Sequence, residues 1–365
     1  MATEQPTIDR TAVENVQEQL FEAALGTFRT YAVYLGSQLG YYDALAAEGP
    51  CTSVELAAAT GTNERYTREW LEQGVVSGIL TCESPEVEPG ARRFVLPAAH
   101  AAVLTDSESL DYLGSLPQTV VGALSPIRDV VDAYRTGEGI EFHEYGEDLH
   151  EGQAAMNRPL FVNELGSEWL PTVEDVDERL RAGGRVADVG CGHGWSSIGI
   201  ARAYPEATVH GIDADAASIA RARENAAAYD AGNRLSFTHA DAATVGAEGE
   251  GSYDLVTAFE CVHDMSDPVP VLSTMRSLAH PDGTVLIMDE RVAESFSPEA
   301  GPVEEFMYGW SVFHCLPVSM VDDGIGTGTV LRESTLRGYA EEAGFSEVEV
   351  LPIENEFFRF YRLTP

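Results

Sequence analysis

The stretch VADVGCGHGWSS, residues 186–197, decides the fold. It predicts a buried strand that turns through Gly190, Gly192 and Gly194 directly into a helix. Glycines let the backbone of such a turn approach a ligand closely, and the N-terminus of the following helix presents unpaired N–H groups. We therefore expect a ligand site at this turn, with Asp188 inside the strand just before the glycines.

Short apolar strands alternate with helices from residue 183 onward. The expected strands cover residues 185–190, 208–213, 235–241, 253–261 and 283–290. Alternation of this kind predicts right-handed crossovers and a parallel sheet that helices cover on both faces. Two further strands, 348–353 and 356–363, are separated by too little chain for a crossover helix. They predict an antiparallel hairpin at the edge of an α/β, Rossmann-like sheet of seven strands.

The N-terminal part, residues 1–104, predicts a separate α-rich winged-helix domain. Helices are expected within residues 11–48, a short one follows Thr52 or Ser53, and another begins at Asn63. A loop rich in proline and glycine then leads to a short strand at residues 92–96.

The remaining chain divides into a bridge and the α/β domain. Residues 105–182 predict a helical bridge that lines a pocket, and residues 183–365 the α/β domain, with an insertion at 292–330. We expect the bridge helices to break at their prolines, which are Pro117, Pro126, Pro159 and Pro171.

The charge of the chain is strongly biased. The sequence has 365 residues, 60 acidic and 22 basic, all of the basic ones arginine, for a net charge of -38. So acidic a surface suits molar salt, where the Debye length falls to about 3 Å, and we interpret it as adaptation to a salt-rich cytoplasm. The alternative, an acidic face for a basic partner, fits less well because the acids spread along the whole chain.

Membrane and disulfide signals are missing from the sequence. It contains no run of 18 apolar residues and no basic-then-apolar start, so we expect neither a membrane span nor a signal peptide. The five cysteines lack CxxC spacing, which argues against a disulfide framework and a zinc site. These features predict a cytoplasmic protein with no metal.

Two strand-end carboxylates strengthen the ligand prediction. Asp213 ends the second strand, nineteen residues after Gly194, where such folds bind a ribose diol, and Asp241 ends the third, where it can receive an adenine amino group. The glycine spacing is GxGxG, whereas dinucleotide-binding dehydrogenases prefer GxGxxG. Asp188 is badly placed for a pyrophosphate but suits a cationic amino-acid moiety, which points to S-adenosylmethionine (SAM). The plainer interpretation of each feature is an ordinary turn or a helix cap.

On these residues the chain resembles the class I SAM-dependent methyltransferases over about residues 183–365. The residues that carry the resemblance are Asp188, Gly190, Gly192, Gly194, Asp213, Asp241, Ala242 and the terminal hairpin. "LGYYDALA", "ELAAATG" and "LEQGVVSGIL" resemble the dimerising winged-helix domain of small-molecule O-methyltransferases, and "HEYG", "VHDMSDP" and "SVFHCLP" an uncharacterised bacterial and archaeal branch. The resemblance implies SAM as cofactor, a small-molecule acceptor and a homodimer formed through the N-terminal domain.

A winged helix also raises the possibility of DNA binding. Its second helix sets Arg65 and Arg68 against Glu64, Glu69 and Glu72, and this surplus of carboxylates argues against a nucleic-acid partner. A SAM-sensing transcription regulator nevertheless stays open as an alternative to an enzyme.

The segment "VHDMSDP" places His263 and Asp264 directly after the fourth strand. In plant-type O-methyltransferases the histidine of such a pair is the general base, and the resemblance extends that role to His263, with Asp289 and Glu290 orienting the imidazole. Met265 stands where a tryptophan usually follows. The alternative is a structural His263, with Asp264 or Asp267 capping the next helix. The enzyme would then be an N- or C-methyltransferase that needs no base.

The acceptor pocket is expected to lie between the insertion and the bridge. Phe259 and Glu260 should touch the cofactor or the acceptor, and a substrate amine held by Glu260 would favour N-methylation. The other candidate walls are Met156, Asn157 and Phe161 from the bridge and Tyr308, Trp310 and His314 from the insertion. A dimer contact is the alternative use of the insertion's aromatic residues.

Overall fold

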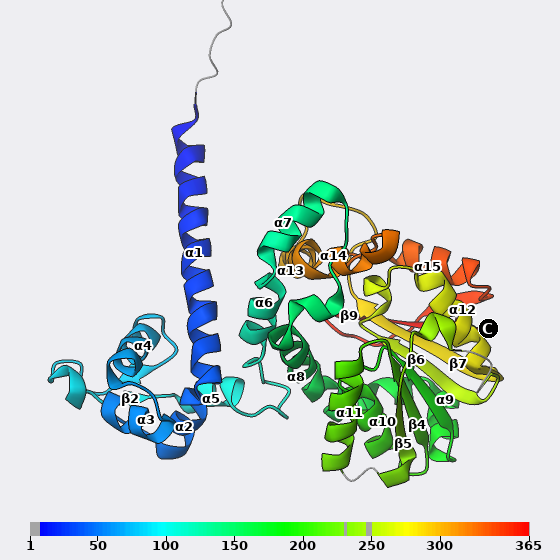
Figure 1. Ribbon diagram of the computed structural model, residues 1–365, viewed down its shortest axis with the longest axis horizontal. Coiled ribbons are helices and arrows are strands. Elements are labelled where there is room, and N and C mark those ends of the chain that lie inside the picture. Colours follow the sequence, from blue (N-terminus) through cyan, green and yellow to red (C-terminus); the bar gives the residue numbers. More distant parts are fainter. Residues whose placement is uncertain (1–7, 230–231, 246–249, 365) are drawn as a thin grey trace, which may run out of the picture. The chain divides into compact units, whose positions relative to one another are not determined.

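The computed structural model describes residues 8–229, 232–245 and 250–364 (Figure 1). The chain forms two compact units, Met1–Val121 and Gly122–Pro365. Their boundary falls inside the segment expected to be a bridge. All five cysteines, Cys51, Cys82, Cys191, Cys261 and Cys315, are free thiols. None of the helices in the described ranges combines the length and the apolar character that crossing a bilayer requires.

The first unit is the expected winged-helix domain. Its elements are α1 (Arg10–Gln38), α2 (Tyr41–Glu48), α3 (Ser53–Thr60), α4 (Glu64–Val76), β1 (Thr81–Cys82), the 3-10 turn η1 (Pro89–Ala91), β2 (Phe94–Val95) and α5 (Ala98–Leu104). Thr52 and Glu55 form a reciprocal capping box at the start of α3, and Asn63 caps α4, as the sequence predicted. β1 and β2 pair antiparallel as the wing.

The second unit contains a seven-stranded sheet in the order β5-β4-β3-β6-β7-β9-β8, which confirms the predicted sheet. Its strands are β3 (Arg185–Val189), β4 (Thr208–Asp213), β5 (Leu235–His239), β6 (Tyr253–Phe259), β7 (Ala279–Glu290), β8 (Glu347–Val350) and β9 (Phe358–Thr364). The first five run parallel, and β9 lies antiparallel between β7 and β8. The terminal hairpin is therefore confirmed as well.

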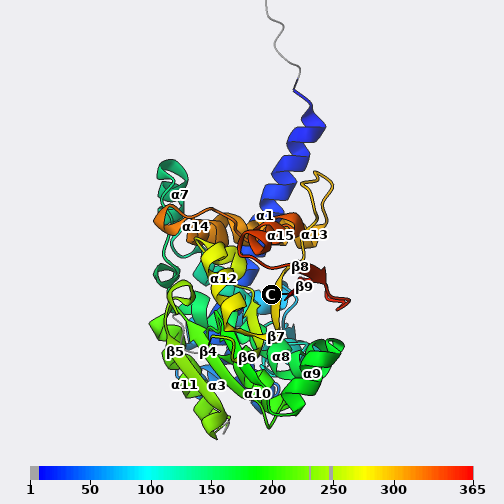
Figure 2. The same cartoon turned by 90° about the vertical axis from the view of Figure 1, so that its right-hand side faces the viewer.

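Side chains alternate between two cores along each central strand, because successive residues of a strand point to opposite faces. On β3, Val186 packs with α8 (Glu147–Asn163), α9 (Glu174–Arg181) and α10 (Trp195–Ala203). The neighbouring Ala187 packs on the other face, with α12 (Pro268–Leu278) and α15 (Glu333–Glu342). Figures 1 and 2 show these helices on the two sides of the sheet. The near-continuous apolar strands of the sequence thus reflect burial on both faces.

The other elements of the bridge and the α/β domain connect or cover the strands. They are α6 (Leu116–Leu124), α7 (Ile127–Thr136), η2 (Phe142–Tyr145), η3 (Leu165–Trp169), η4 (Leu170–Thr172), α11 (Ala216–Ala228), η5 (Gly232–Arg234), η6 (Ala242–Thr244), η7 (Val262–Asp264), α12 (Pro268–Leu278), α13 (Pro302–Trp310), η8 (Ser311–Cys315), α14 (Leu316–Ser319), η9 (Val321–Asp323) and α15 (Glu333–Glu342). The 292–330 insertion is therefore mostly helical, with η8 as a π-helical turn between α13 and α14.

The expected helix break at Pro159 is wrong, because α8 continues through it to Asn163. A proline ring removes one helical hydrogen bond, which usually ends or kinks a helix. Here Pro159 is buried, and the backbone of α8 near Phe161 lies directly against Gly199 of α10. Close packing of the two helices compensates for the missing bond.

Candidate functional site

A cavity of about 390 Å³ opens at the carboxyl ends of β3, β4, β5 and β6. In open α/β sheets this edge is where ligands bind. The strand ends and the glycine turn form one wall, and η2 with α8 forms another. Of the residues that the sequence predicted to bind the cofactor or the acceptor, the cavity is lined by Asn157, Phe161, Gly190, Gly192, Asp213, Asp241, Ala242, Phe259 and Glu260.

The three glycines of the turn have positive φ angles, of 67° at Gly190, 50° at Gly192 and 80° at Gly194. Only glycine adopts such angles without strain. A side chain at Gly192 would extend into open space, whereas at Gly194 it would meet Ala222 and Phe237. Gly192 therefore faces the cavity, and Gly194 lets α11 and β5 pack close to the turn without lining the cavity itself.

Asp188 lies behind the turn and does not line the cavity. Its carboxylate is almost fully buried and accepts hydrogen bonds from the hydroxyls of Ser196 and Ser197, each at 2.6 Å, and of Thr257 at 2.8 Å. Burial raises its pKa, while these three donors act in the opposite direction. Asp188 thus fixes the start of α10 to β3 and β6, and it shapes the glycine turn from behind.

Replacing Asp188 with alanine should lower the free energy of unfolding by about 3 kcal/mol, because three buried hydroxyls lose their acceptor. Urea denaturation at constant high salt measures the change. Asp254→Ala is the matched control, since Asp254 accepts from the exposed Arg185 N–H and should cost about 1 kcal/mol. Equal losses for the two variants would contradict the structural role of Asp188.

Asp213 and its neighbours form the next part of the wall. Asp213 accepts from the Gly192 N–H at 2.8 Å and from the Asp215 N–H at 2.8 Å. Asp215 caps α11, so the capping role that the sequence left open belongs to Asp215. Asp241 accepts from the Ala243 N–H at the start of η6. Carboxylates have lone pairs left after one bond per oxygen, so Asp213 and Asp241 can each still accept from a ligand.

These residues fit SAM. Gly192 leaves room for an amino-acid moiety beside the helix N-terminus, and Asp213 and Asp241 present carboxylates one strand and two strands away from β3. Phe259 lines the same cavity with its ring 5.7 Å from that of Phe161. The cavity holds no guanidinium among its described lining residues, which agrees with a ligand that carries no phosphate.

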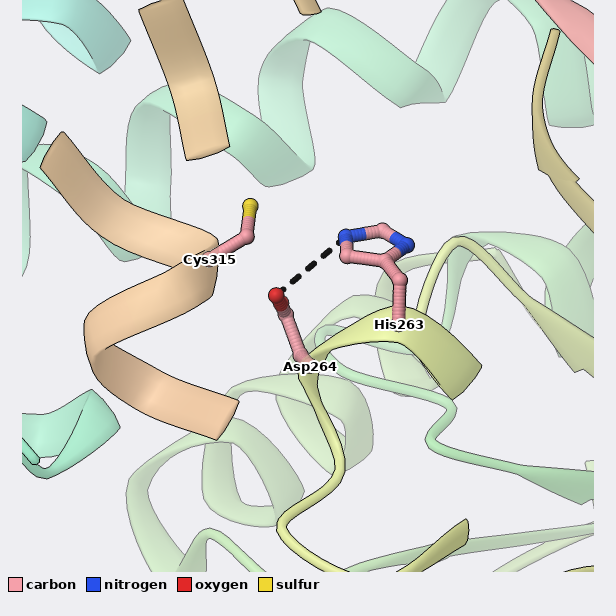
Figure 3. A group of neighbouring side chains, drawn as sticks. All are labelled: His263, Asp264 and Cys315. Carbon is pink, nitrogen blue, oxygen red and sulfur yellow. Dashed lines mark ion pairs between the residues drawn. The ribbon is translucent and has the colours of Figure 1, made fainter. Parts of the chain in front are cut away.

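His263 lies next to the cavity, buried among three carboxylates. Figure 3 shows it with one of them, Asp264, and with Cys315. Its Nδ1 is 2.8 Å from an Asp289 oxygen and 2.9 Å from a Glu290 oxygen. Its Nε2 is 3.2 Å from an oxygen of Asp264, which does line the cavity. Both β7 carboxylates therefore contact the imidazole, as the sequence expected. Asp267 stands at the start of α12 but makes no side-chain cap, so this part of the structural alternative is not seen.

The electrostatics of the cluster favour a charged imidazole. Burial lowers the pKa of His263, but Glu290, Asp289 and Asp264 raise it more, and the pKa lies well above its usual value. Burial raises the pKa of Asp264 and Asp289, yet the His263 charge holds both below their ordinary range. Burial raises the pKa of Glu290 well above its ordinary value. These shifts favour a positive charge on His263 and negative charges on Asp264 and Asp289, and they make Glu290 the carboxyl that holds its proton most readily.

Two sets of three side chains in this cluster bring possible metal-ligand atoms within 4.8 Å of one another. One set is His263, Asp264 and Cys315, and the other is His263, Asp289 and Glu290. In both, the imidazole already pairs with the carboxylates. Burial raises the pKa of the Cys315 thiol to about 12, so it is protonated. The pairing accounts for these contacts without a metal ion.

The other expected acceptor residues do not line the cavity. Met156 lies on α8 outside the lining, and the Tyr308 hydroxyl accepts a hydrogen bond from Arg332 at 3.0 Å. Trp310 packs against the buried core that Tyr145 and its neighbours form. His314 is buried, with its ring 4.6 Å from that of Tyr145. Of the 292–330 insertion, only Val318 is among the described lining residues.

Sequence reasoning missed much of the wall that η2 and α8 provide. Phe142, His143 and His150 line the cavity, and the imidazole of His150 stacks on the Phe142 ring at 4.3 Å. The polar and aromatic composition of residues 137–152 was a visible signal for a pocket wall. It did not indicate which side chains face inward, because η2 is a 3-10 helix of only four residues, too short to show a periodic pattern.

Comparison with known proteins agrees with this architecture. Residues 180–335 match the methyltransferase domain family, and residues 28–106 match the Rv2258c-like winged HTH domain family. A 3-amino-4-hydroxybenzoate 4-O-methyltransferase from Streptomyces cremeus is 26% identical over 376 residues, which cover 94% of this chain and 90% of that protein.

Two solved structures share the fold at low identity. The mitomycin 7-O-methyltransferase MmcR has a TM-score of 0.70 at 18% identity, covering 97% of this chain and 99% of that one. Human N-acetylserotonin methyltransferase in complex with SAM has a TM-score of 0.63 at 17% identity, covering 100% and 99%.

Proposed function

We propose that this SAM-dependent methyltransferase, whose catalytic domain follows a winged-helix domain, methylates a hydroxyl oxygen of a small molecule, with His263 as general base. The observation that carries this proposal is the arrangement around the imidazole. Nδ1 contacts Asp289 and Glu290, while Nε2 is directed at Asp264 on the cavity wall. A proton taken from the cavity side would therefore go to Nε2.

Bound in the cavity, SAM supplies a methyl group on a positively charged sulfur. The acceptor hydroxyl needs a base as its oxygen becomes the nucleophile, and positioned bases contribute about 10²- to 10⁴-fold to rate. Nε2 of a neutral His263 takes the hydroxyl proton, and Asp289 stabilises the imidazolium that forms. Asp264 holds the hydroxyl or the new imidazolium at the wall. The apolar lining residues, including Phe161 and Phe259, exclude water from the acceptor oxygen.

The test of oxygen as nucleophile uses a compound that offers both an oxygen and a nitrogen for methylation. 2-Aminophenol offers a hydroxyl and an amine on adjacent carbons. Incubation with SAM should produce S-adenosylhomocysteine and a product with a methoxy signal in the NMR spectrum. An N-methyl product would contradict the proposal.

We also propose that the protein is a homodimer through its N-terminal domain. Helix α1 exposes large apolar side chains, including Phe21 at 64% and Phe28 at 69%, and an apolar helix face of this kind is typical of a protein interface. On α4, Arg65 pairs with Glu69 at 2.6 Å and Arg68 pairs with Glu64 at 3.3 Å. These pairs support a role of the domain in dimerisation in place of DNA binding.

The double substitution Phe21→Glu with Phe28→Glu is expected to shift the protein from dimer to monomer in light scattering at high salt. In the dimer the substitutions would place four carboxylates in an apolar interface, and burying unpaired charges there is strongly unfavourable. Gln19→Glu is the control, because the helical period places Gln19 on the opposite side of α1. A dimer that survives the double substitution would refute the proposed interface.

A further inference from the structure

The wall of the cavity is acidic. Its described lining residues include six carboxylates, Glu141, Asp213, Asp215, Asp241, Glu260 and Asp264. The basic groups among them are three imidazoles, those of His143, His150 and His193, and no arginine is present in this described lining. Burial lowers the pKa of His193, which disfavours a positive charge on that imidazole. An anionic acceptor would meet repulsion here and find no guanidinium to pair with.

Glu260 differs from the other carboxylates of the wall. It follows β6 with a φ of 52°, a left-handed conformation that is uncommon for a residue other than glycine. Strain of this kind tends to persist where the surrounding structure fixes a functional side chain. The backbone N–H of Glu260 donates to the Met288 carbonyl at 2.8 Å, which anchors the residue to β7.

Only one side of the Glu260 carboxylate has a partner. Oε2 accepts from the Asn157 amide of α8, whereas Oε1 is buried and accepts no hydrogen bond among the described residues. A buried oxygen without a donor costs about 1–3 kcal/mol. A ligand that brings an N–H or O–H group to Oε1 removes this cost. Asp213 and Asp241, in contrast, accept from backbone N–H groups.

Building on the proposed O-methylation, we propose that Glu260, held by Asn157, recognises a hydrogen-bond donor on the acceptor, preferably an amine, which is not itself methylated. The acceptor is therefore a neutral or cationic hydroxyl compound with an amino or second hydroxyl group, and an anionic acceptor is disfavoured. Glu260 is therefore a determinant of acceptor specificity, in addition to the His263 cluster.

One competing role must be separated from this one, because SAM itself carries an ammonium group. If Glu260 held that ammonium group, replacing Glu260 would weaken binding of the cofactor and leave the choice of acceptor unchanged. The Glu260→Gln variant distinguishes the two roles, since glutamine keeps the shape and the Asn157 contact but loses the charge and one acceptor site.

The experiment measures binding of phenol, 2-aminophenol, tyramine and 4-hydroxybenzoate to the full-length protein saturated with S-adenosylhomocysteine, by calorimetry at high salt. The wild type should bind the two amines at least about tenfold more tightly than phenol, which is the size of a charged hydrogen bond. 4-Hydroxybenzoate should bind weakest. Glu260→Gln should remove the preference for the amines and leave the affinity for S-adenosylhomocysteine within about twofold.

Glu141→Gln is the matched control, because it removes one negative charge from the same wall without touching Glu260. It should keep the preference for amines. Equal binding of phenol and the amines to the wild type, or a loss confined to S-adenosylhomocysteine in Glu260→Gln, would overturn the proposal. Product formation does not enter this test, so its outcome is independent of whether oxygen is the methylated atom.

Discussion

Replacing His263 with alanine is expected to reduce turnover about 10²- to 10⁴-fold at saturating acceptor, the range that a positioned base supplies. The affinity for S-adenosylhomocysteine should change little, because His263 does not line the cavity. Isothermal titration and the rate of S-adenosylhomocysteine formation measure the two quantities on the same preparation.

His280→Ala is the control, since His280 is an exposed histidine whose ring contacts only Asp282 in the described ion pairs. It should leave turnover unchanged. His263→Ala could also fail because it leaves Asp289 and Asp264 buried without a cation, which destabilises the fold. His263→Gln addresses this, because its NH2 group can still donate to one of these carboxylates but the amide cannot take a proton. Full turnover in folded His263→Gln would rule out the base.

The pH profile gives a second readout of the same assignment. The pKa of His263 is raised well above its usual value by Glu290, Asp289 and Asp264. A raised pKa keeps the imidazole protonated to higher pH, and only its neutral form can act as a base. Turnover should rise with pH until it passes the raised pKa, and Asp289→Asn should move this rise to lower pH. A merely structural His263 would leave the profile flat across this range.

Most of the fold could be predicted because the local sequence of each central strand is enough to identify it as a strand. Val186, Ala187 and Val189 belong to a run that is apolar on both faces, which is the pattern of a central parallel strand. The glycine turn and Asp213 follow from the same logic, since their spacing places them at one sheet edge. The helix break at Pro159 was wrong because packing of α8 against α10, a tertiary effect, overrides the local signal.

The candidate site could be predicted only in part. Asp289 and Glu290 were correctly placed near His263, because β6 and β7 are neighbours and their ends meet. The burial of His263 behind Asp264 could not be read from "VHDMSDP", since it depends on how η7 turns and on the insertion that covers it. Trp310 was expected in the pocket and instead packs in a core, because an aromatic residue on a helix carries no mark of the face it uses.

The strongest effect on stability should come from salt. The chain carries 60 acidic residues against 22 arginines, so most carboxylates cannot have a positive partner. Exposed pairs such as Arg135–Asp132, at 2.8 Å, contribute little individually. When the salt concentration falls from about 1 M to 0.1 M, the Debye length grows from about 3 Å to about 10 Å, and repulsion between unpaired carboxylates then reaches across the surface.

We therefore expect the protein to be folded in molar potassium chloride and largely unfolded after dialysis into about 0.1 M salt. Circular dichroism follows the change, and return to molar salt should restore the signal. Sucrose at matched osmolarity is the control, because it favours burial without screening charge and should rescue the fold poorly. Equal melting temperatures in the two salt concentrations would show that the net charge of -38 serves something other than stability in salt. An acidic surface for a basic partner would then become the better explanation.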